Sequence, residues 1–197
     1  LLQLRVLCGA TGSAKTRILL ALKERGAQVV DLEGLASHKG SLLGGLPGVP
    51  QPSQKHFDTL LTQELQALDV SRPVYIEGES PKIGRVALPL QLVHRMRQAK
   101  VVEIAASSQA RLEFLLRDYA YLGDEAEHLC ERLGYLNEIQ GNETIARWQD
   151  WARNGNLPAL FEQLMHLHYD PQYERSQSKH FVHWYEKQSV LADSLSD

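Results

Sequence analysis

Residues 9–16 read Gly-Ala-Thr-Gly-Ser-Ala-Lys-Thr, and this stretch constrains the fold more than any other part of the chain. It follows an apolar run over residues 4–8 and leads into a helical pattern that begins at Lys15. A strand, a glycine-rich turn and a helix, in that order, are typical of a phosphate-binding loop. The turn directs backbone N–H groups at an anion, and the helix N-terminus adds roughly half a positive charge. The alternative interpretation is a glycine-rich turn that binds no ligand.

The loop pattern predicts a role for each of its residues. The candidate phosphate-binding residues are Gly9, Thr11, Gly12, Ser13, Ala14, Lys15 and Thr16. Lys15 would reach the outer phosphates, and the Thr16 hydroxyl would bind Mg²⁺. Ala14 stands where a glycine is usual. We expect Gly12 to have the positive φ angle and Ala14 to occupy the first helical position, where φ is negative.

Strands and helices alternate in the first half of the chain. We expect strands at about 4–8, 28–32, 73–77 and 101–104, and helices at about 15–25, 54–68 and 89–98. A long loop covers residues 34–52. This alternation predicts an α/β fold, with a mainly parallel, P-loop NTPase-like sheet flanked by helices.

The second half of the chain reads as helical and predicts a cap or lid over the α/β core. The expected helices are 109–120, 123–139, 142–153 and 156–168, followed by a short strand at about 180–184 that returns to the sheet. We therefore divide the chain into an α/β core (1–108), a helical cap (109–175), and a returning strand with a C-terminal tail (176–197).

Composition sets the broad class of the protein. A chain of 197 residues suits one domain with a small appendage. Cys8 and Cys130 are isolated and form neither a metal motif nor a disulfide framework, so we expect a reducing, cytoplasmic environment. No apolar run approaches the roughly 18 residues that span a membrane, so no membrane partner is expected. Because the chain begins at Leu1 rather than Met, we interpret it as an excerpt of a longer protein.

Charge is unevenly placed along the chain. Residues 82–117 contain seven Lys or Arg against two Glu, whereas residues 118–162 contain nine acids against three Arg. The basic stretch indicates an anionic partner, unless both stretches are only solvated helix faces. Its arginines are candidates for phosphate clamps or an RNA-facing patch. We assign Arg85 and Arg111 to substrate binding, and Arg95, Arg97 and Arg117 to the RNA-facing patch.

Two groups of polar residues follow predicted strands, and the carboxyl edge of a parallel sheet is where ligands bind. Glu77 and Glu79 follow the third strand and lie on one side of extended chain, as a metal-binding or general-base pair would. We expect Lys15, Glu77 and Glu79 to be catalytic, and Thr16 and Glu77 to bind the metal. Ordinary loop acids are the alternative. After the second strand, the substrate-binding candidates are Asp31, Glu33, His38, Lys39 and Ser41.

The order and spacing of several motifs resemble one family over nearly the whole chain. The motifs are the Thr-Gly-Ser-x-Lys-Thr loop, residues 31–36 (DLEGLA), 38–41 (HKGS), 51–57 (QPSQ…F), 72–80 (RP…ExES), 83–84 (IG) and 168–173 (HYDP…Y). Together they are similar to the P-loop domain of bacterial tRNA 2-selenouridine synthases. Ala14 and Lys39 depart from that family's pattern, which has Gly and Arg there.

The resemblance implies an enzyme that modifies the wobble uridine of certain tRNAs. Such enzymes convert 2-thiouridine to 2-selenouridine through an S-geranyl intermediate, with geranyl diphosphate and selenophosphate as co-substrates. The resemblance also implies tRNA as a partner, together with an N-terminal rhodanese-like domain that carries a reactive Cys and is absent here. The P-loop would then bind a diphosphate, either of geranyl diphosphate or of ATP or GTP, with Mg²⁺.

Two other functions fit the same sequence features. A small-molecule kinase shares the P-loop, the parallel sheet and a helical lid with arginines. A nucleotide-binding regulatory module would bind nucleotide without any chemistry of its own. Transfer of phosphate from ATP to a small acceptor would distinguish the kinase from both other interpretations.

Overall fold

The structure is a computed structural model that describes residues 2–195, and it contains two compact units. The first unit comprises the described residues of Leu1–Gly9, Ala14–Ala105 and Ser176–Leu191. The second unit comprises those of Ala10–Ser13, Ala106–Arg175 and Ala192–Asp197. Within residues 2–195, no helix is long and apolar enough to cross a membrane.

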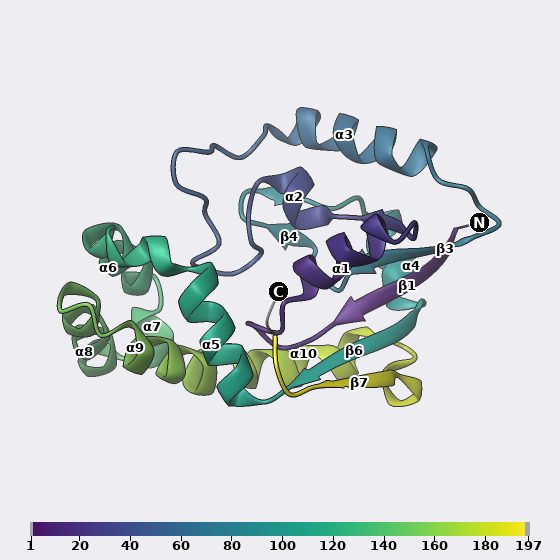
Figure 1. The fold of residues 1–197 in the computed structure, drawn as a ribbon. Helices are drawn as coiled ribbons and strands as arrows, with labels where there is room; N and C mark the ends of the chain where they lie inside the picture. Colours follow the sequence, from purple (N-terminus) through teal and green to yellow (C-terminus); the bar gives the residue numbers. More distant parts are fainter. Residues whose placement is uncertain (1, 196–197) are drawn as a thin grey trace. The chain divides into compact units, whose positions relative to one another are not determined.

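A five-stranded sheet with strand order β2-β3-β1-β6-β7 forms the centre of the first unit (Figure 1). Its strands are β1 (Gln3–Cys8), β2 (Gln28–Val30), β3 (Pro73–Glu77), β6 (Lys100–Ala106) and β7 (Gln188–Ala192). The pairs β2–β3, β3–β1 and β1–β6 are parallel. The carboxyl ends of β1 and β3 therefore lie side by side, with Leu7 paired to Glu77.

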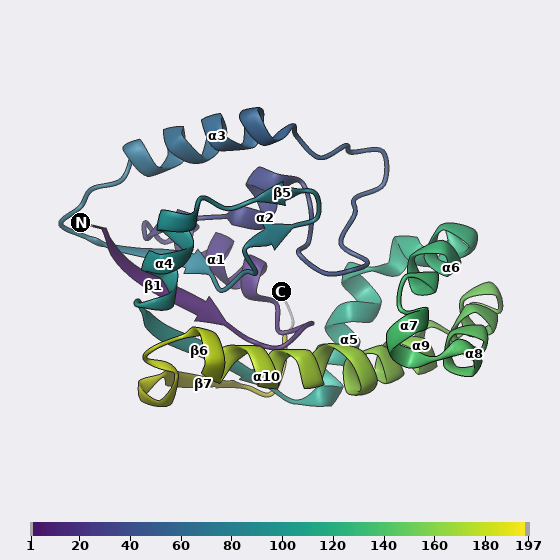
Figure 2. The ribbon, with the colours of Figure 1, turned by 180° about the vertical axis from the view of Figure 1, so that it is seen from behind.

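Helices cover both faces of this sheet. They are α1 (Lys15–Glu24), α2 (Leu32–Ala36), α3 (Gln54–Gln66), α4 (Leu90–Arg97), the 3-10 helix η3 (Trp184–Glu186) and the last residues of α10 (Asp170–His180). Figures 1 and 2 show α1 on one face of β1 and α4 on the other. Burial of Val6 and Ile76 between these layers, with no exposed surface, accounts for the apolar runs of β1 and β3.

Side-chain caps explain where two of these helices begin. The Ser53 hydroxyl accepts a hydrogen bond from the His56 N–H (3.3 Å) at the start of α3. The Asp31 carboxylate accepts from the Gly34 N–H (2.7 Å) at the start of α2. Each cap satisfies one of the N–H groups that the first helical turn leaves without a backbone partner.

The second unit is helical. It contains α5 (Ser108–Asp118), the 3-10 helix η1 (Ala120–Gly123), α6 (Ala126–Gly134), α7 (Asn137–Gln140), α8 (Asn142–Arg153), α9 (Leu157–Leu164), the π-helical turn η2 (Met165–Tyr169) and the first residues of α10. Trp148 of α8 is fully buried, and its indole N–H donates to Gln163 Oε1 of α9 at 2.8 Å. A buried indole with a satisfied N–H fixes how these two helices pack.

The predicted α/β fold class, with a mainly parallel sheet flanked by helices, is confirmed. The predicted strand at 180–184 is wrong, because that segment holds the end of α10 and the start of η3. Its aromatic residues suggested a strand. Phe181 is instead a buried core residue, and the Val182 N–H donates to the Arg97 carbonyl beside α4. The strand that joins the sheet after α10 is instead β7. Its residues are almost all exposed and do not alternate between buried and exposed, so the sequence does not indicate a strand there.

Two further predictions differ in detail from the structure, and one element was not predicted. The helix expected at 123–139 is two helices, α6 and α7. The helix expected at 156–168 ends as α9 at Leu164 and continues through η2 into α10. The hairpin of β4 (Lys82–Ile83) and β5 (Val86–Ala87) was not predicted, because two-residue strands carry almost no periodicity. Residues 196–197 of the predicted tail lie outside the described residues.

Candidate functional site

The glycine-rich loop joins β1 to α1, and Gly12 lies at its sharpest point. Gly12 has φ +86°, which confirms the expected positive angle. A Cβ added there would lie 2.9 Å from the Arg111 carbonyl oxygen and 2.9 Å from Leu115 Cγ. Only glycine satisfies both the backbone angle and the close approach of α5.

The prediction for Ala14 is wrong. Ala14 has φ +57° and ψ +27°, in the left-handed region, and it caps the helix rather than forming its first turn. Its carbonyl accepts the first helical hydrogen bond, from the Ile18 N–H at 3.0 Å. The loop therefore reverses direction with two left-handed residues, Gly12 and Ala14. For an alanine this conformation costs roughly 1–2 kcal/mol, which explains why the usual residue at this position is glycine.

Two polar side chains of the loop make contrasting contacts. Lys15 Nζ donates a hydrogen bond to the Gly9 carbonyl at 2.9 Å, so the lysine side chain folds back along the loop. The Ser13 hydroxyl is buried, and among residues 2–195 it has no hydrogen-bond partner. The Lys15 ammonium and the Ser13 hydroxyl therefore both lie at the loop that the sequence predicts to bind phosphate.

Three glutamates and Thr16 form an acidic cluster beside the start of α1. Thr16 Oγ1 lies 2.6 Å from Glu33 Oε2 and 2.8 Å from Glu77 Oε1. The Glu33 backbone N–H also donates to Glu77 Oε2 at 3.0 Å. Because a hydroxyl carries one proton, Thr16 donates to only one carboxylate at a time. Either the single hydroxyl proton is shared between the two carboxylates, or one carboxyl group is protonated and donates to Thr16.

The electrostatics of the cluster agree with a shared proton. Burial, and next the charge of Glu33, raise the pKa of Glu77 to about 8. Burial, and next the charge of Glu79, raise the pKa of Glu33 to about 7. Burial also raises the pKa of Glu79, although the charge of Lys15 opposes the shift. Near neutral pH, Glu33 and Glu77 are therefore partly protonated, and a bound cation would displace those protons.

Sheet topology brings this cluster together. The Gly78 N–H donates to the Leu7 carbonyl at 2.8 Å, which extends the β1–β3 pairing past Glu77. A Cβ at Gly78 would lie 2.6 Å from Cys8 Sγ, so a larger residue would push the two strand ends apart. Glu33 reaches the cluster from α2, directly after β2. The sequence placed Glu33 at this sheet edge but did not predict its contact with Thr16.

The donor set suits Mg²⁺ bound together with a phosphate ligand. Within residues 2–195, no three His, Cys, Asp or Glu side chains are arranged to hold an ion by themselves. Mg²⁺ usually binds one or two carboxylates and completes its shell with phosphate oxygens and water. Thr16 and Glu77, next to the glycine-rich loop, offer that partial shell.

The other candidates on the second loop have visible local roles. Asp31 caps α2, as described above. His38 is buried, and its Nδ1 accepts a hydrogen bond from the Gly40 N–H at 3.1 Å. A Cβ at Gly40 would lie 2.7 Å from Glu79 Oε2 and 2.8 Å from Glu33 Oε1, so this loop lies against the acidic cluster. Lys39 and Ser41 belong to the same loop, and their substrate-binding roles stay predictions.

The five candidate arginines have different surroundings. Arg111, in the second unit, is buried and pairs with Asp170: its Nη2 lies 2.5 Å from one carboxylate oxygen and its Nη1 lies 3.2 Å from the other. The Nε of Arg111 donates to the Thr11 carbonyl at 2.9 Å. Three others donate hydrogen bonds to backbone carbonyl oxygens: Arg85 to Gln51, Arg95 to Leu2 (3.0 Å) and Arg117 to Leu195 (2.6 Å). Arg97 lines a cavity. Their phosphate and tRNA contacts stay predictions.

These features define a P-loop NTPase-like α/β protein. They are a mainly parallel sheet, a glycine-rich loop between its central strand and a helix, and carboxylates on the neighbouring strand. Comparison with known families narrows this class. Residues 2–140 match the model described as the tRNA 2-selenouridine synthase AAA domain, and the chain belongs to this family.

Curated relatives named tRNA 2-selenouridine synthase are similar over most of the chain. The protein of Marinobacter nauticus is 40% identical over 87% of this chain, and that of Alcanivorax borkumensis is 32% identical over 88%. That of Cupriavidus pinatubonensis is 37% identical over 81%. These matches cover 53%, 54% and 44% of the relatives, so the chain spans about half the length of the proteins it matches.

Proposed function

We propose that this chain is the diphosphate- and tRNA-binding part of a transferase that modifies the wobble uridine of tRNA. The observation that carries the proposal is the juxtaposition of Thr16, at the end of the glycine-rich loop, with Glu33 and Glu77 in a member of the tRNA 2-selenouridine synthase family. The proposed overall change converts 2-thiouridine to 2-selenouridine through an S-geranyl intermediate. Selenium from selenophosphate would replace the S-geranyl group, which would leave as geranylthiol, and hydrolysis of the selenium–phosphorus bond would release phosphate.

In the proposed reaction, the glycine-rich loop would bind the diphosphate leaving group. In the geranylation step, the sulfur of 2-thiouridine forms a bond to carbon 1 of geranyl diphosphate, and the carbon–oxygen bond breaks. Diphosphate leaves with the bonding electrons, and the N3–H proton of the base is released. Charge grows on the diphosphate, so donors aimed at it stabilise the transition state. Lys15 and the loop amides would supply those donors, and Thr16 and Glu77 would hold Mg²⁺.

The acidic cluster would also respond to the ligand. Displacement of protons from Glu33 and Glu77 by the cation would release them to solvent, because the pKa values of these groups lie at about 7 and about 8 without it. Binding of Mg²⁺ with diphosphate at pH 7 should therefore release protons. Calorimetric titration in two buffers with different ionisation enthalpies measures that release directly.

The first test is binding of geranyl diphosphate, ATP and GTP by calorimetry, each with Mg²⁺, to the parent chain and to Lys15→Ala. Loss of the lysine should weaken the preferred ligand by about 1.5–3 kcal/mol, the range for a hydrogen bond to a charged group. Lys23→Ala, at the exposed end of α1, removes the same charge and should leave binding unchanged. Equal affinity of Lys15→Ala and the parent would contradict the phosphate-binding role.

The second test separates the transferase from the alternatives. The chain is incubated with thiolated tRNA, geranyl diphosphate and Mg²⁺, and the nucleosides are then analysed by mass spectrometry. A geranylated nucleoside supports the proposal. Transfer of phosphate from ATP to a small acceptor would indicate a kinase instead. Nucleotide binding with unchanged tRNA and no phosphate transfer would indicate a regulatory module.

A further inference from the structure

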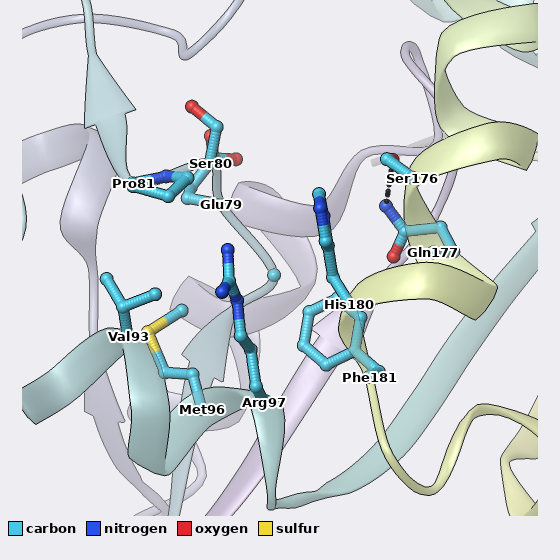
Figure 3. A pocket seen from close by; sticks show the side chains of 11 residues that line it. Glu79, Ser80, Pro81, Val93, Met96, Arg97, Ser176, Gln177, His180 and Phe181 are labelled. Atoms are coloured by element: carbon cyan, nitrogen blue, oxygen red, sulfur yellow. Dashed lines mark hydrogen bonds between the residues drawn. The ribbon is translucent and has the colours of Figure 1, made fainter. Parts of the chain in front are cut away.

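A cavity of about 170 Å³ lies in the first unit, between the end of β3, α4 and the C-terminal end of α10 (Figure 3). One wall is apolar and is formed by Val93 and Met96 of α4 and by Phe181, which follows α10. At roughly 30 Å³ per water molecule, the volume holds on the order of six water molecules. The space therefore suits a small organic molecule rather than a long chain.

Two cationic or potentially cationic side chains also line the cavity, and neither has a hydrogen-bond partner. Within residues 2–195, the Arg97 guanidinium has no ion-pair partner and no acceptor, and the His180 imidazole makes no hydrogen bond. Figure 3 shows the two side chains side by side, extending from α4 and from the end of α10 into the cavity. Both residues are half-buried, so their N–H groups are held at the cavity with no acceptor from the protein.

The electrostatics of His180 reflect this position among cations. Burial, and next the charges of Arg97 and Lys179, lower the pKa of His180, and all three causes disfavour the imidazolium. A bound anion would supply the opposite charge and favour it. Glu79 lines the same cavity, and burial raises its pKa, so its carboxyl group keeps a proton to higher pH. A protonated carboxyl group donates to an anion instead of repelling it.

The cationic side and the apolar wall together specify the chemistry of a ligand. The planar guanidinium of Arg97 presents paired N–H donors that match the two oxygens of a carboxylate. The wall of Val93, Met96 and Phe181 suits an apolar group, as in most small-molecule sites, where a few polar groups fix the orientation. A carboxylate attached directly to a ring or a short branched chain combines both properties within the available volume.

We propose that this cavity, the Arg97–His180 pocket, binds a small organic carboxylate. The carboxylate would lie against Arg97 and His180, and the apolar group of the ligand would lie against Val93, Met96 and Phe181. The inference goes beyond the proposed function, which assigns no ligand to this cavity and places its own ligand at the glycine-rich loop.

Two other occupants fit less well. A phosphate-type oxyanion would pair with Arg97 and His180, but it would leave the apolar wall facing water. A hydrocarbon would match the wall, but it would leave both cationic side chains without an acceptor. The organic carboxylate is the occupant that satisfies the two sides of the cavity at once.

The test uses benzoate as the probe and two molecules that each lack one of its features. Acetate has the same carboxylate without the ring, and benzamide has the same ring and nearly the same shape without the charge. Saturation-transfer NMR titrations measure binding of each molecule to the chain. We expect both acetate and benzamide to bind at least on the order of tenfold more weakly than benzoate, because each loses either the buried ring or the charged hydrogen bonds.

A pair of variants tests Arg97. Arg97→Met should weaken benzoate binding on the order of tenfold or more, the effect of a hydrogen bond between charged groups. Lys179→Met removes one positive charge from an exposed position of α10 and should change benzoate binding much less. Thermal unfolding checks that both variants fold. Because the Arg97 guanidinium has no protein partner within residues 2–195, its loss should not lower the unfolding temperature.

The pH dependence of benzoate binding tests His180. Affinity should rise as the pH falls from about 8 to about 6, because the imidazolium binds an anion better than the neutral ring does. Protonation of Glu79 acts in the same direction, because it removes a negative charge from the cavity. His180→Gln should therefore reduce this slope, whereas His166→Gln, the same change at an exposed histidine of the second unit, should preserve it. An unchanged slope in His180→Gln would show that this imidazole does not contact the carboxylate.

Three results would overturn the inference. They are benzamide binding as tight as that of benzoate, no binding of benzoate, and loss of benzoate binding in Lys15→Ala, which would place the anion at the glycine-rich loop. Tighter binding of inorganic phosphate than of benzoate to Lys15→Ala would also contradict it and would identify a phosphate site. The diphosphate titrations and the tRNA analysis test the proposed function separately. A chain that fails those tests but distinguishes benzoate from benzamide would retain the pocket and lose the proposed function.

Discussion

At the residue scale, the acidic cluster couples proton binding to stability. Glu77 has no exposed surface, and its carboxyl group shares Thr16 with Glu33. In water each of these carboxyl groups would ionise near pH 4.5, whereas in the fold burial keeps them protonated to about pH 7 and 8. The cluster is therefore least stable, without ligand, at the pH at which it would bind a cation most strongly.

The pH dependence follows from the sign of these shifts. Between about pH 4.5 and 8 the folded chain binds more protons than the unfolded chain, so the free energy of unfolding falls as pH rises through this interval. Glu77→Gln cannot ionise and should flatten the dependence, with a gain on the order of 2 kcal/mol over the parent at pH 8. Urea denaturation at several pH values, without ligand, measures both.

The exposed Glu127→Gln variant provides the control for this prediction. Glu127 pairs with Arg153 on the surface, and this pairing lowers its pKa rather than raising it. Its removal should leave the fall in stability between pH 5 and 8 unchanged. An equally steep fall in Glu77→Gln and the parent would show that other groups cause the dependence.

Ala14 makes a second residue-scale prediction. Its left-handed conformation (φ +57°) is unfavourable for alanine and easy for glycine. Ala14→Gly should raise the free energy of unfolding by about 0.5–1 kcal/mol, because relief of the strain outweighs the added flexibility of the unfolded chain. Diphosphate affinity should stay equal or improve. A loss of stability in thermal or urea denaturation would contradict the observed angle.

At the scale of elements, one ion pair fixes how α10 begins. Arg111 of α5 binds both carboxylate oxygens of Asp170 and the Thr11 carbonyl, so the second unit ties α5, α10 and the turn of the glycine-rich loop to one guanidinium. Arg111 is buried, with 7% of its side chain exposed, against 26% for Asp170. Such a pair affects stability chiefly because removal of one partner leaves the other as an unpaired buried charge.

Asp170→Asn should therefore destabilise the fold by about 2 kcal/mol, less than for a fully buried pair because water reaches the carboxylate. It should also shift the loop, and diphosphate affinity should fall with stability. Glu127→Gln removes a partner from the exposed Arg153 pair and should have little effect on either property. Urea denaturation measures the loss of stability, and calorimetry measures the loss of diphosphate affinity. Equal stability of the two variants would show that the buried Arg111 pair contributes no more than the exposed Arg153 pair.

At the scale of the whole molecule, a net charge of −3 conceals a strongly basic stretch at residues 82–117. If this stretch contacts tRNA phosphates, binding should weaken steeply with salt, because each contact releases counterions. Arg95→Glu combined with Lys100→Glu should weaken binding and reduce the slope of log affinity against log salt concentration by about 1–2. The loss should be similar for tRNAs of different sequence, because phosphate contacts do not read bases.

Lys23→Glu combined with Arg25→Glu makes the same charge change at the exposed end of α1 and is the matched control. Gel-shift titrations at two salt concentrations compare it with the basic-stretch variant. If both double variants bind tRNA like the parent, residues 82–117 are only a solvated surface. If both lose binding equally, the effect is one of net charge and not of this stretch.

Local rules allowed the sequence by itself to determine the glycine-rich loop, the strands around it and the α/β fold class. The positive φ of Gly12, the cap at Ser53 and the buried strand β1 each follow from a few neighbouring residues. Glu77 and Glu79 were placed at the correct sheet edge because parallel strands end together. Periodicity does not report exposed or very short strands, so β7, β4 and β5 were missed.

Tertiary structure alone decided the properties that depend on distant neighbours. Glu33 and Glu77 meet only because β2 and β3 are adjacent, and their raised pKa values require the low dielectric that this packing creates. The left-handed angle of Ala14 is set by the turn it completes, against the preference of the residue. Arg97 and His180 line one cavity because α4 and the end of α10 lie on either side of it. Dihedral preferences and periodicity are local, whereas burial and electrostatic coupling arise only when distant segments pack together.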